Sequence, residues 1–424
     1  MRYAVEPLAL PWAIIVSYRR MLAAQWLDPD QLRCLQEAKL RRLVHHAYEH
    51  VPYYRWLFDQ AGLSPHAIRR LDDLPRLPIT TKAELQSQPD ATLLARTSTR
   101  SRLASERSSG STGRPFQVFF DSHCHAVRTA VFLRALACAG YVLGQRLLLF
   151  TGSRTRSHLA RALRWRYAPI EAPVSESLLR YERFAPHVLY GCVTPLRLLA
   201  EEVRAHQRSL SRPRMVITTA ELLDAATREL IQRVFGCEVY DFYGLSETGL
   251  VAWECPAHNG CHLAEDTFIV EEVPAREPDA QRLILTTLDS LAMPFLRYDT
   301  GDLGIVDRRE RCACGRSFAL LRRIDGRLAD CVRLPDGRVI SPYAITTRLE
   351  TIPGIRRYHV VQEDLVTVVV SVDAGDTRDS SVADAIVGRL GALLGDAVSV
   401  IVHEAPRIEP PPGRKFRVVE SNIQ

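Results

Sequence analysis

Apolar residues in the first hundred positions recur at helical spacing. In LRCLQEAKLRRLVHHAYEH, residues 32–50, they fall every three or four positions, and the pattern ends just before Val51 and Pro52. The proline-rich run LDDLPRLPITTKAEL, residues 71–85, predicts an extended connector that leads into a helix beginning at Thr80 or Thr81. The chain is therefore expected to open with a helical segment.

From about 118 to 300, short apolar runs alternate with helical segments. The runs are RLLLF, HVLY, RMVITT, EVYDFY and RLILTT, and this alternation is typical of a layered α/β domain. After about 325, the runs YHVVQ, VTVVVSV and VSVIVHE accompany a helix near 342–352, which predicts a small α+β unit. We therefore predict an α/β protein with a large domain over 1–325 and a small domain over 331–424.

Length and composition agree with this division. A chain of 424 residues exceeds what one hydrophobic core usually serves. Its 46% apolar and 25% charged residues are ordinary for a globular protein and exclude the disordered, collagen-like and coiled-coil classes. No window of about 18 residues lacks charge or proline, so no membrane span is expected. Ten irregularly spaced cysteines indicate a reducing cytoplasm rather than a disulfide framework.

The charge balance limits the partners. The net charge of +6 comes from 55 basic and 49 acidic residues, and no long basic run occurs, so nucleic acid is not an expected partner. Lys39, Lys82 and Lys415 are the only lysines. A site that needs a primary ammonium therefore has few candidates, because a guanidinium cannot replace it.

Six consecutive Ser, Thr and Gly residues open the segment SSGSTGRPF, residues 108–116. Their backbone N–H groups and hydroxyls can bind an anion, since glycine lets the backbone curl into a concave nest. The segment is not a Walker A loop, because the strand pattern FQVFF follows at 116–120, and the loop is predicted to join two strands. Taken alone, it is equally compatible with an exposed hairpin.

The segment DFYGLSETG, residues 241–249, follows the strand-like GCEVY. A carboxylate beyond the carboxyl end of a strand is well placed to hold Mg²⁺ beside a polyphosphate, and Glu247 is the candidate. The alternative is a helix N-terminus that is capped by Ser246, with Glu247 stabilised by the helix dipole.

Two further segments carry single candidates. In RYDTGDLGIV, residues 297–306, Asp302 is predicted to lie in a turn, where it could accept both hydroxyls of a ribose or act as a plain turn residue. In PPGRKFRVV, residues 411–419, Lys415 offers an ammonium that suits a phosphoryl or carboxylate oxygen. A solvated lysine near the end of the chain is the alternative.

In this order, and over nearly the whole length, these four motifs resemble the adenylate-forming (ANL) superfamily. Within it the chain is similar to the phenylacetate-CoA ligase, CapK-like and coenzyme F390 synthetase-like branch, and the segments YEHVPYYRWLFDQAGL and LPITTKAEL contribute to the resemblance. The resemblance implies an adenylation domain and a small mobile domain that carries the catalytic lysine. It implies ATP-dependent activation of an aromatic or other compact carboxylic acid as an acyl-adenylate, then thioester formation with coenzyme A.

The resemblance also implies residue roles. Lys415 would bridge the substrate carboxylate and the α-phosphate, Glu247 would hold Mg²⁺, and Asp302 would bind the ribose. The motif TTAEL, residues 218–222, would lie beside the adenine, with Ala220 where glycine is usual. The implied cofactor-binding residues are Ser108, Ser109, Gly110, Ser111, Thr112, Gly113, Ala220, Glu221, Asp241, Phe242, Tyr243, Gly244, Asp302, Arg323 and Arg327.

Two stretches depart from the family pattern. The hinge usually reads Gly-Arg-x-Asp, but here Ala329 follows Gly326-Arg327-Leu328 and Asp330 comes one place later. Either Asp330 serves as the pivot or the domain rotation is altered. Residues 150–167, FTGSRTRSHLARALRWRY, carry five arginines where phenylacetate ligases have a glycine-rich stretch. The acyl or coenzyme A pocket is therefore expected to differ.

A second metal site is predicted from CPAH at 255–258 and CACG at 312–315. Cysteine and histidine pairs from two loops are a standard way to assemble a tetrahedral zinc site, and some members of the branch carry a zinc knuckle here. The alternative is a group of reduced thiols. Four protein ligands leave no open position for water, so the zinc would be structural. The expected ligands are Cys255, His258, Cys312 and Cys314, with Cys261 or His262 as substitutes for one of them.

Two other functions stay open. The acceptor could be an amine, a hydroxyl or a carrier-protein thiol, because these enzymes share the adenylation half-reaction. The chain could also be a non-catalytic nucleotide-binding accessory of polysaccharide or secondary-metabolite biosynthesis, although Glu247, Asp302 and Lys415 together favour an enzyme. The sequence specifies neither the acid nor the pathway. The resemblance suggests a homodimer, and no interface can be identified from the sequence.

Overall fold

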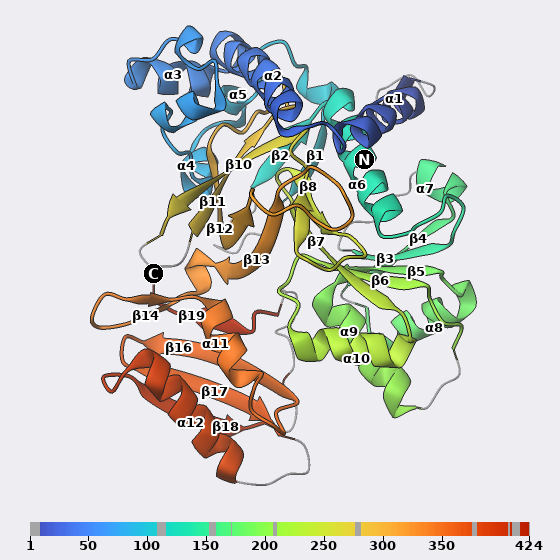
Figure 1. Cartoon of the computed structure of the whole chain (residues 1–424), viewed down its shortest axis with the longest axis vertical. Helices are drawn as coiled ribbons and strands as arrows, with labels where there is room; N and C mark the ends of the chain where they lie inside the picture. Colours follow the sequence, from blue (N-terminus) through green and yellow to red (C-terminus); the bar gives the residue numbers. More distant parts are fainter. Residues whose placement is uncertain are drawn as a thin grey trace.

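The computed structural model describes residues 9–107, 116–151, 158–170, 172–206, 210–275, 281–374, 380–405, 408 and 416–423. The N-terminal helices lie at one end of a large sheet, and a smaller body with its own sheet follows toward the C-terminus (Figure 1). The predicted α/β class with a large and a small unit is confirmed.

The chain opens with helices, as predicted. Asp28 caps the second helix by accepting the backbone N–H of Gln31 at 2.8 Å, and the helix ends where Pro52 begins the next one. Thr81 caps the fourth by accepting the N–H of Glu84 at 3.2 Å, which confirms the predicted helix start. The helices are α1 (Ala9–Ala24), α2 (Pro29–His50), α3 (Pro52–Gln60), α4 (Lys82–Ser87) and α5 (Asp90–Leu93).

One sheet of 11 strands forms the centre of the large unit. Five parallel strands make one half, with α6 (Ser122–Cys138), α7 (His158–Ala162), α8 (Val174–Phe184), α9 (Val193–Ala205) and α10 (Ala225–Phe235) between or beside them in the chain. The strands are β3 (Leu147–Thr151), β4 (Trp165–Pro169), β5 (Val188–Cys192), β6 (Met215–Thr219) and β7 (Glu238–Leu245). Their apolar runs are buried, as expected where helices cover a parallel sheet.

The other half of the sheet is antiparallel and extends from β7. It contains β8 (Gly249–Glu254), β9 (Cys261–Leu263), β10 (Phe268–Pro274), β11 (Gln281–Thr287), β12 (Tyr298–Asp307) and β13 (Leu320–Arg327). A separate hairpin pairs β1 (Ala104–Arg107) with β2 (Gln117–Phe120). The predicted anion loop therefore begins and ends on paired strands, while residues 108–115 themselves lie outside the described part of the chain.

The small unit has its own sheet and core. Its strands lie in the order β18, β17, β16, β19, and the apolar side chains of Val332, Ile345, Val360, Val370 and Ile386 are fully buried within it. After β13, a short turn over Leu328–Asp330 leads into this unit. Its elements are β14 (Val332–Arg333), β15 (Val339–Ile340), α11 (Pro342–Leu349), β16 (Arg357–Asp364), β17 (Thr367–Asp373), α12 (Ser380–Leu394), β18 (Ser399–Glu404) and β19 (Val419–Ser421).

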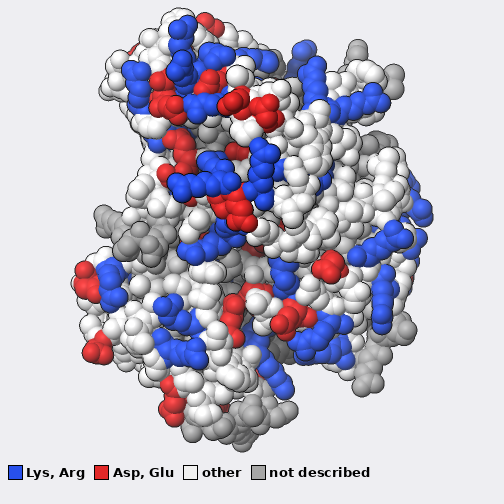
Figure 2. Space-filling model, in the orientation of Figure 1, with Lys and Arg blue, Asp and Glu red and all other residues white. Residues whose placement is uncertain are grey.

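Basic and acidic side chains are interspersed on the face drawn in Figure 2. Many of the arginines are used in ion pairs; Arg322, for example, contacts Asp307 at 2.9 Å and also pairs with Glu310. Within the described ranges, no helix is both long enough and apolar enough to cross a bilayer.

Candidate active site

Glu247 lies in the turn between β7 and β8, where Leu245 pairs with Gly249. The alternative of a helix N-terminus at this position is therefore wrong. The side chain is only 7% exposed, and its Oε1 accepts the hydroxyl of Tyr298 at 3.3 Å. Burial, with the carboxylate of Glu247 beside it, raises the pKa of Tyr298, so the phenol stays a proton donor.

Lys82 completes the surroundings of this carboxylate. Its Nζ lies 3.1 Å from Oε1 of Glu247. The lysine comes from the N-terminal helical segment, and the chain just before it is held against the start of β12 by two backbone hydrogen bonds. The N–H of Thr80 donates to Arg297 O at 2.9 Å, and the N–H of Asp299 donates to Thr80 O at 2.8 Å.

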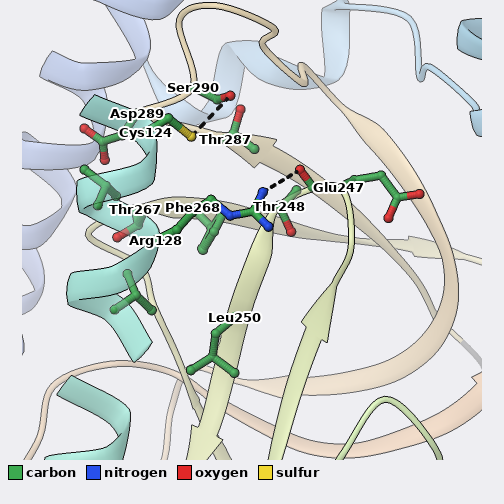
Figure 3. Close-up of a pocket in the computed structure, with 12 residues that line it drawn as sticks. Cys124, Arg128, Glu247, Thr248, Leu250, Thr267, Phe268, Thr287, Asp289 and Ser290 are labelled. Carbon is green, nitrogen blue, oxygen red and sulfur yellow. Dashed lines mark hydrogen bonds between the residues drawn. The ribbon is translucent and has the colours of Figure 1, made fainter. Parts of the chain in front are cut away.

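Arg128 on α6 bridges Glu247 and Glu106. Its guanidinium donates to the backbone oxygen of Glu247 at 3.3 Å and to the carboxylate of Glu106 at 2.6 Å, and Glu106 stands two residues before the loop. Figure 3 shows Arg128 beside the backbone of Glu247, with the Glu247 carboxylate pointing away from the pocket drawn. The guanidinium of Arg128 thus joins the end of β1 to the turn that carries Glu247.

Asp302 forms the second carboxylate of the site. It lies within β12 and not in the predicted turn, because a bulge opposite Arg282 and Ile284 takes up the extra residues of the TGD segment. The side chain is 8% exposed and accepts the hydroxyl of Tyr243 at 2.7 Å. Burial raises the pKa of Asp302, and burial next to Asp302 raises the pKa of Tyr243.

Arg327 and Arg323, both on β13, have different surroundings. The Nε of Arg327 lies 3.5 Å from Oδ1 of Asp302, so this arginine is beside the proposed ribose ligand. Arg323 donates to Asp325 at 2.6 Å, and its guanidinium stacks 4.8 Å from the ring centre of Tyr343 on α11. Arg323 therefore contacts the small unit rather than Asp302.

The TTAEL motif covers the last two residues of β6 and the three that follow. Ala220 has φ 68°, in the left-handed region, which explains why related enzymes would favour glycine at this position. The carboxylate of Glu221 accepts the backbone N–H of Thr194 at 2.6 Å, so it caps the start of α9. This structural contact occupies one carboxylate oxygen of Glu221.

Residues 241–244 divide between the site and the core. Asp241 accepts the hydroxyl of Thr218 at 2.7 Å, and burial together with the nearby Glu254 raises the pKa of Asp241 to about 7. Phe242 is 1% exposed and packs against Tyr190, so its side chain belongs to the hydrophobic core. Gly244 allows close approach of the hairpin, because an added Cβ would lie 2.9 Å from Gly249 O.

Ser108 to Gly113 and Lys415 fall outside the described residues, and their predicted roles stay predictions. The residues after Lys415 are described. Phe416 is buried 5.4 Å, centre to centre, from the ring of His359, and Arg417 donates to Asp330 at 2.8 Å. The two residues that directly follow Lys415 are therefore attached to the small sheet and to the turn between the two units.

Three cysteines and one histidine meet beside the sheet. Their ligand atoms all lie within 4.8 Å of one another, with Cys255 Sγ 3.5 Å from Cys312 Sγ and Cys314 Sγ 3.2 Å from Nε2 of His262. Burial lowers the pKa of His262 to about 4, so its imidazole is neutral, the form that binds metals. Cys255, Cys312 and Cys314 are thus placed together as predicted.

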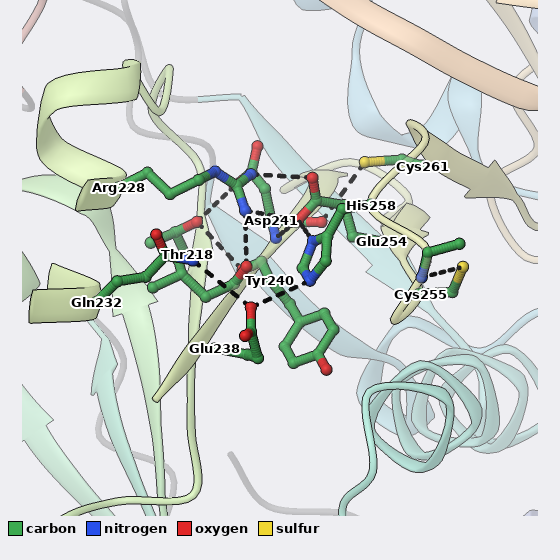
Figure 4. Close-up of polar contacts among 12 residues, drawn as sticks. Thr218, Arg228, Gln232, Glu238, Tyr240, Asp241, Glu254, Cys255, His258 and Cys261 are labelled. Atoms are coloured by element: carbon green, nitrogen blue, oxygen red, sulfur yellow. Dashed lines mark hydrogen bonds and ion pairs between the residues drawn. The ribbon is translucent and has the colours of Figure 1, made fainter. Parts of the chain in front are cut away.

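His258 is not part of this group, which corrects the favoured ligand set. Its backbone has φ 46°, and its imidazole stacks on Tyr240 with 5.0 Å between ring centres. The ring nitrogens face Glu254 at 3.5 Å and Glu238 at 3.4 Å, as Figure 4 shows. His262, named from the sequence as a substitute, occupies the fourth position, whereas Cys261 donates toward Asp241 O at 3.5 Å.

Comparison with known proteins identifies relatives of this chain by sequence. The chain is 34% identical over 350 residues to the phenylacetate-coenzyme A ligase of Thermus thermophilus, a match that covers 78% of this chain and 77% of that protein. It is 32% identical over 342 residues to the phenylacetate-coenzyme A ligase of Escherichia coli (strain K12), which covers 73% and 76%. No family model matches the chain.

A solved structure supports the fold. The 2-hydroxyisobutyryl-CoA ligase in its postadenylation state superposes with a TM-score of 0.79, covering 94% of this chain and 91% of that chain. The sequence identity between the two is 19%, so the likeness concerns architecture.

Proposed function

The chain belongs to the phenylacetate-coenzyme A ligase family, and we propose on that premise that it acts on an aromatic or other compact carboxylic acid of the phenylacetate class. It is an AMP-forming acid–thiol ligase, which joins a carboxylate to ATP as an acyl-adenylate and then transfers the acyl group to coenzyme A. One observation carries the residue assignment. Two hydrogen bonds, Tyr298 to Glu247 and Tyr243 to Asp302, join the DFYGLSETG and RYDTGD motifs in one site.

The first half-reaction brings two anions together. A carboxylate oxygen attacks the α-phosphate of ATP, and pyrophosphate leaves with the electron pair of the broken P–O bond. Positive charge and fixed hydrogen-bond donors are what this step requires. We assign these tasks to Lys415 and to the backbone N–H groups of residues 108–113, which the resemblance places at the phosphates.

Mg²⁺ is proposed at Glu247. The carboxylate of Glu247 is buried, its backbone is linked through Arg128 to Glu106 two residues before the anion loop, and a carboxylate oxygen is a ligand that Mg²⁺ prefers. When bound, Mg²⁺ neutralises phosphate charge. Asp302 would accept the ribose hydroxyls, with Arg327 keeping a positive charge beside it.

A structural zinc is proposed at Cys255, His262, Cys312 and Cys314. Around a tetrahedral zinc with bonds of about 2.3 Å, ligand sulfur atoms lie about 3.8 Å apart, and the observed separations up to 4.8 Å match a site that contracts slightly on metal binding. Four protein ligands leave no position for a reacting water, and the group is distinct from the Glu247 and Asp302 site.

The remaining proposals concern assembly and motion. We propose that Asp330, buried and paired with Arg417, acts as the pivot about which the small domain, residues 331–424, rotates between the half-reactions. A homodimer is also proposed, and so is a reducing compartment, because the ten irregularly spaced cysteines do not suit a disulfide framework.

The proposed acid class is tested by acid-dependent exchange of labelled pyrophosphate into ATP, measured without coenzyme A over a panel of aromatic and aliphatic acids. Fast exchange with compact aromatic acids supports the proposal. Exchange confined to long aliphatic acids would contradict it. Adding coenzyme A, an amine or a carrier protein to the active acid then separates the thiol ligase from the alternative acceptors.

Asp302→Asn is expected to weaken ATP and AMP binding by about 10- to 100-fold, because the amide offers one acceptor oxygen where the carboxylate offers two charged ones. Isothermal titration with each nucleotide checks this result. Asp307→Asn is the matched control, since Asp307 lies on the same strand but pairs with Arg322 at 2.9 Å. Equal affinities for Asp302→Asn and wild type would remove Asp302 from the ribose site.

A further inference from the structure

Lys82 is a cation inside the site that neither the four motifs nor the family resemblance assigned. Arginine supplies all but three of the 55 basic residues of this chain, yet the position beside Glu247 holds a compact ammonium. The Lys82 side chain keeps 26% of its surface exposed, while that of Glu247 keeps 7%. The lysine therefore lies at the open side of a carboxylate that is otherwise enclosed.

The chain brings Lys82 to this place rigidly. Thr80 is fully buried, and its hydroxyl donates to Leu296 O at 3.1 Å in addition to the backbone bonds that join it to Arg297 and Asp299. Lys82 then occupies the first position of α4, directly after the capping residue Thr81. The segment is anchored on β12, the strand that carries Asp302 and also Tyr298, whose hydroxyl donates to Glu247, so the ammonium is held in a fixed place beside the site.

The surroundings indicate what this ammonium meets when a nucleotide binds. Arg128 links the backbone of Glu247, the residue that pairs with Lys82, to Glu106, which stands two residues before the anion loop. A strongly hydrated point charge on a flexible stem suits phosphate oxygens. Oε1 of Glu247 already accepts from Tyr298 and faces Lys82, so a metal ion that binds this oxygen would displace the ammonium of Lys82.

We propose that Lys82 is an active-site residue that binds the β- or γ-phosphate of ATP. In the absence of nucleotide it neutralises Glu247; when Mg²⁺ and ATP enter, it exchanges the carboxylate for a polyphosphate oxygen and leaves Glu247 to the metal. Lys82 takes part in no covalent step. It stabilises the charge on the departing pyrophosphate. The proposal rests on the adenylating function above.

Lys82→Met is expected to weaken binding of ATP with Mg²⁺, and of pyrophosphate with Mg²⁺, by about 10- to 100-fold, with AMP affinity unchanged, because AMP lacks the β- and γ-phosphates. Isothermal titration measures all three ligands. Lys39→Met is the matched control. Lys39 also forms an ion pair from the N-terminal helices, 2.7 Å from Asp289, with a similar 29% exposure, and its ammonium also donates to Asp266 O. Lys39→Met should bind all three ligands as wild type does.

Equal losses for AMP and ATP, or no loss for either, would overturn the proposal. Lys82→Arg keeps the positive charge and should retain part of the ATP affinity. If Lys82→Met fails to fold, the ATP affinity of Lys82→Arg is compared with its AMP affinity instead. Transfer from supplied acyl-adenylate to coenzyme A by the Lys39→Met control should also match wild type. If the wild-type protein showed no ligase activity but Lys82→Met still lost ATP affinity, the proposed reaction would be contradicted. The role of Lys82 in phosphate binding would nevertheless stand.

Discussion

Lys415→Ala is expected to lower the rate of acyl-adenylate formation by at least about 100-fold while ATP binding stays largely intact. The carboxylate and the α-phosphate repel each other as they approach, and the Lys415 ammonium would neutralise both only when they meet. The loss therefore falls on the transition state rather than on the bound nucleotide. Phe416 and Arg417, which follow Lys415, are held by His359 and Asp330, so the substitution leaves its attachment in place.

Two measurements separate this effect from a general loss of structure. Acid-dependent pyrophosphate exchange reports adenylation, and transfer from supplied acyl-adenylate to coenzyme A reports the second half-reaction. The variant should lose the first and keep the second. Lys415→Arg should recover little, because a planar guanidinium cannot occupy the position of a compact ammonium. Full acyl-adenylate formation by Lys415→Ala would contradict the assigned role.

Loss of the structural metal is expected to have the second large effect. Wild-type protein should contain about one zinc per chain, and Cys312→Ser should lose it and lower Tm by about 10 °C. The reason is that the four ligands come from two parts of the sheet. Cys255 directly follows β8 and His262 lies in β9, whereas Cys312 and Cys314 belong to the loop between β12 and β13. One metal joins these two parts of the sheet.

The two histidines supply the matched control. His262→Gln should lose zinc, and His258→Gln should keep it, because His258 faces Glu254 and Glu238 instead of the cysteines. Metal analysis by mass spectrometry and thermal unfolding check both variants. A Cys312→Ser protein that kept its zinc and its Tm, or wild-type protein without zinc, would contradict the proposed metal site.

Local patterns were sufficient for most of the fold. The capping residue Thr81, the end of α2 before Pro52 and the buried strands β3, β5 and β6 follow from periodicity and from the limits that proline sets on the backbone. The turn predicted at Asp302 was wrong, because glycine and aspartate also occur in β-bulges, and the pairing with β11 decides which of the two forms.

The site was predictable only where a motif is contiguous. Glu247 and Asp302 stand in segments whose residue types indicate their chemistry. Arg128 lies in an ordinary helix and carried no signal, because its contacts with Glu106 and Glu247 are made by tertiary packing. Lys82 had one weak signal, its rarity as a lysine, and its partner lies in a distant part of the sequence.

The histidine of the metal group shows the limit of spacing arguments. A Cys-x-x-His spacing favours His258, but a left-handed backbone at that residue turns its side chain onto Tyr240. In β9, neighbouring side chains alternate between the two faces of the sheet, so His262 faces the cysteines while Cys261 faces Asp241 O. Which face a residue takes depends on strand pairing, which the spacing alone does not specify.

The central claim is that the acid is activated through its adenylate. The most direct test supplies phenylacetate, or the most active acid of the panel, with ¹⁸O in both carboxylate oxygens, together with ATP, Mg²⁺ and coenzyme A. Mass spectrometry of the products should find one ¹⁸O in the phosphate of AMP, none in pyrophosphate and one in the acyl thioester. Label in inorganic phosphate accompanied by ADP, or AMP without label, would contradict the account.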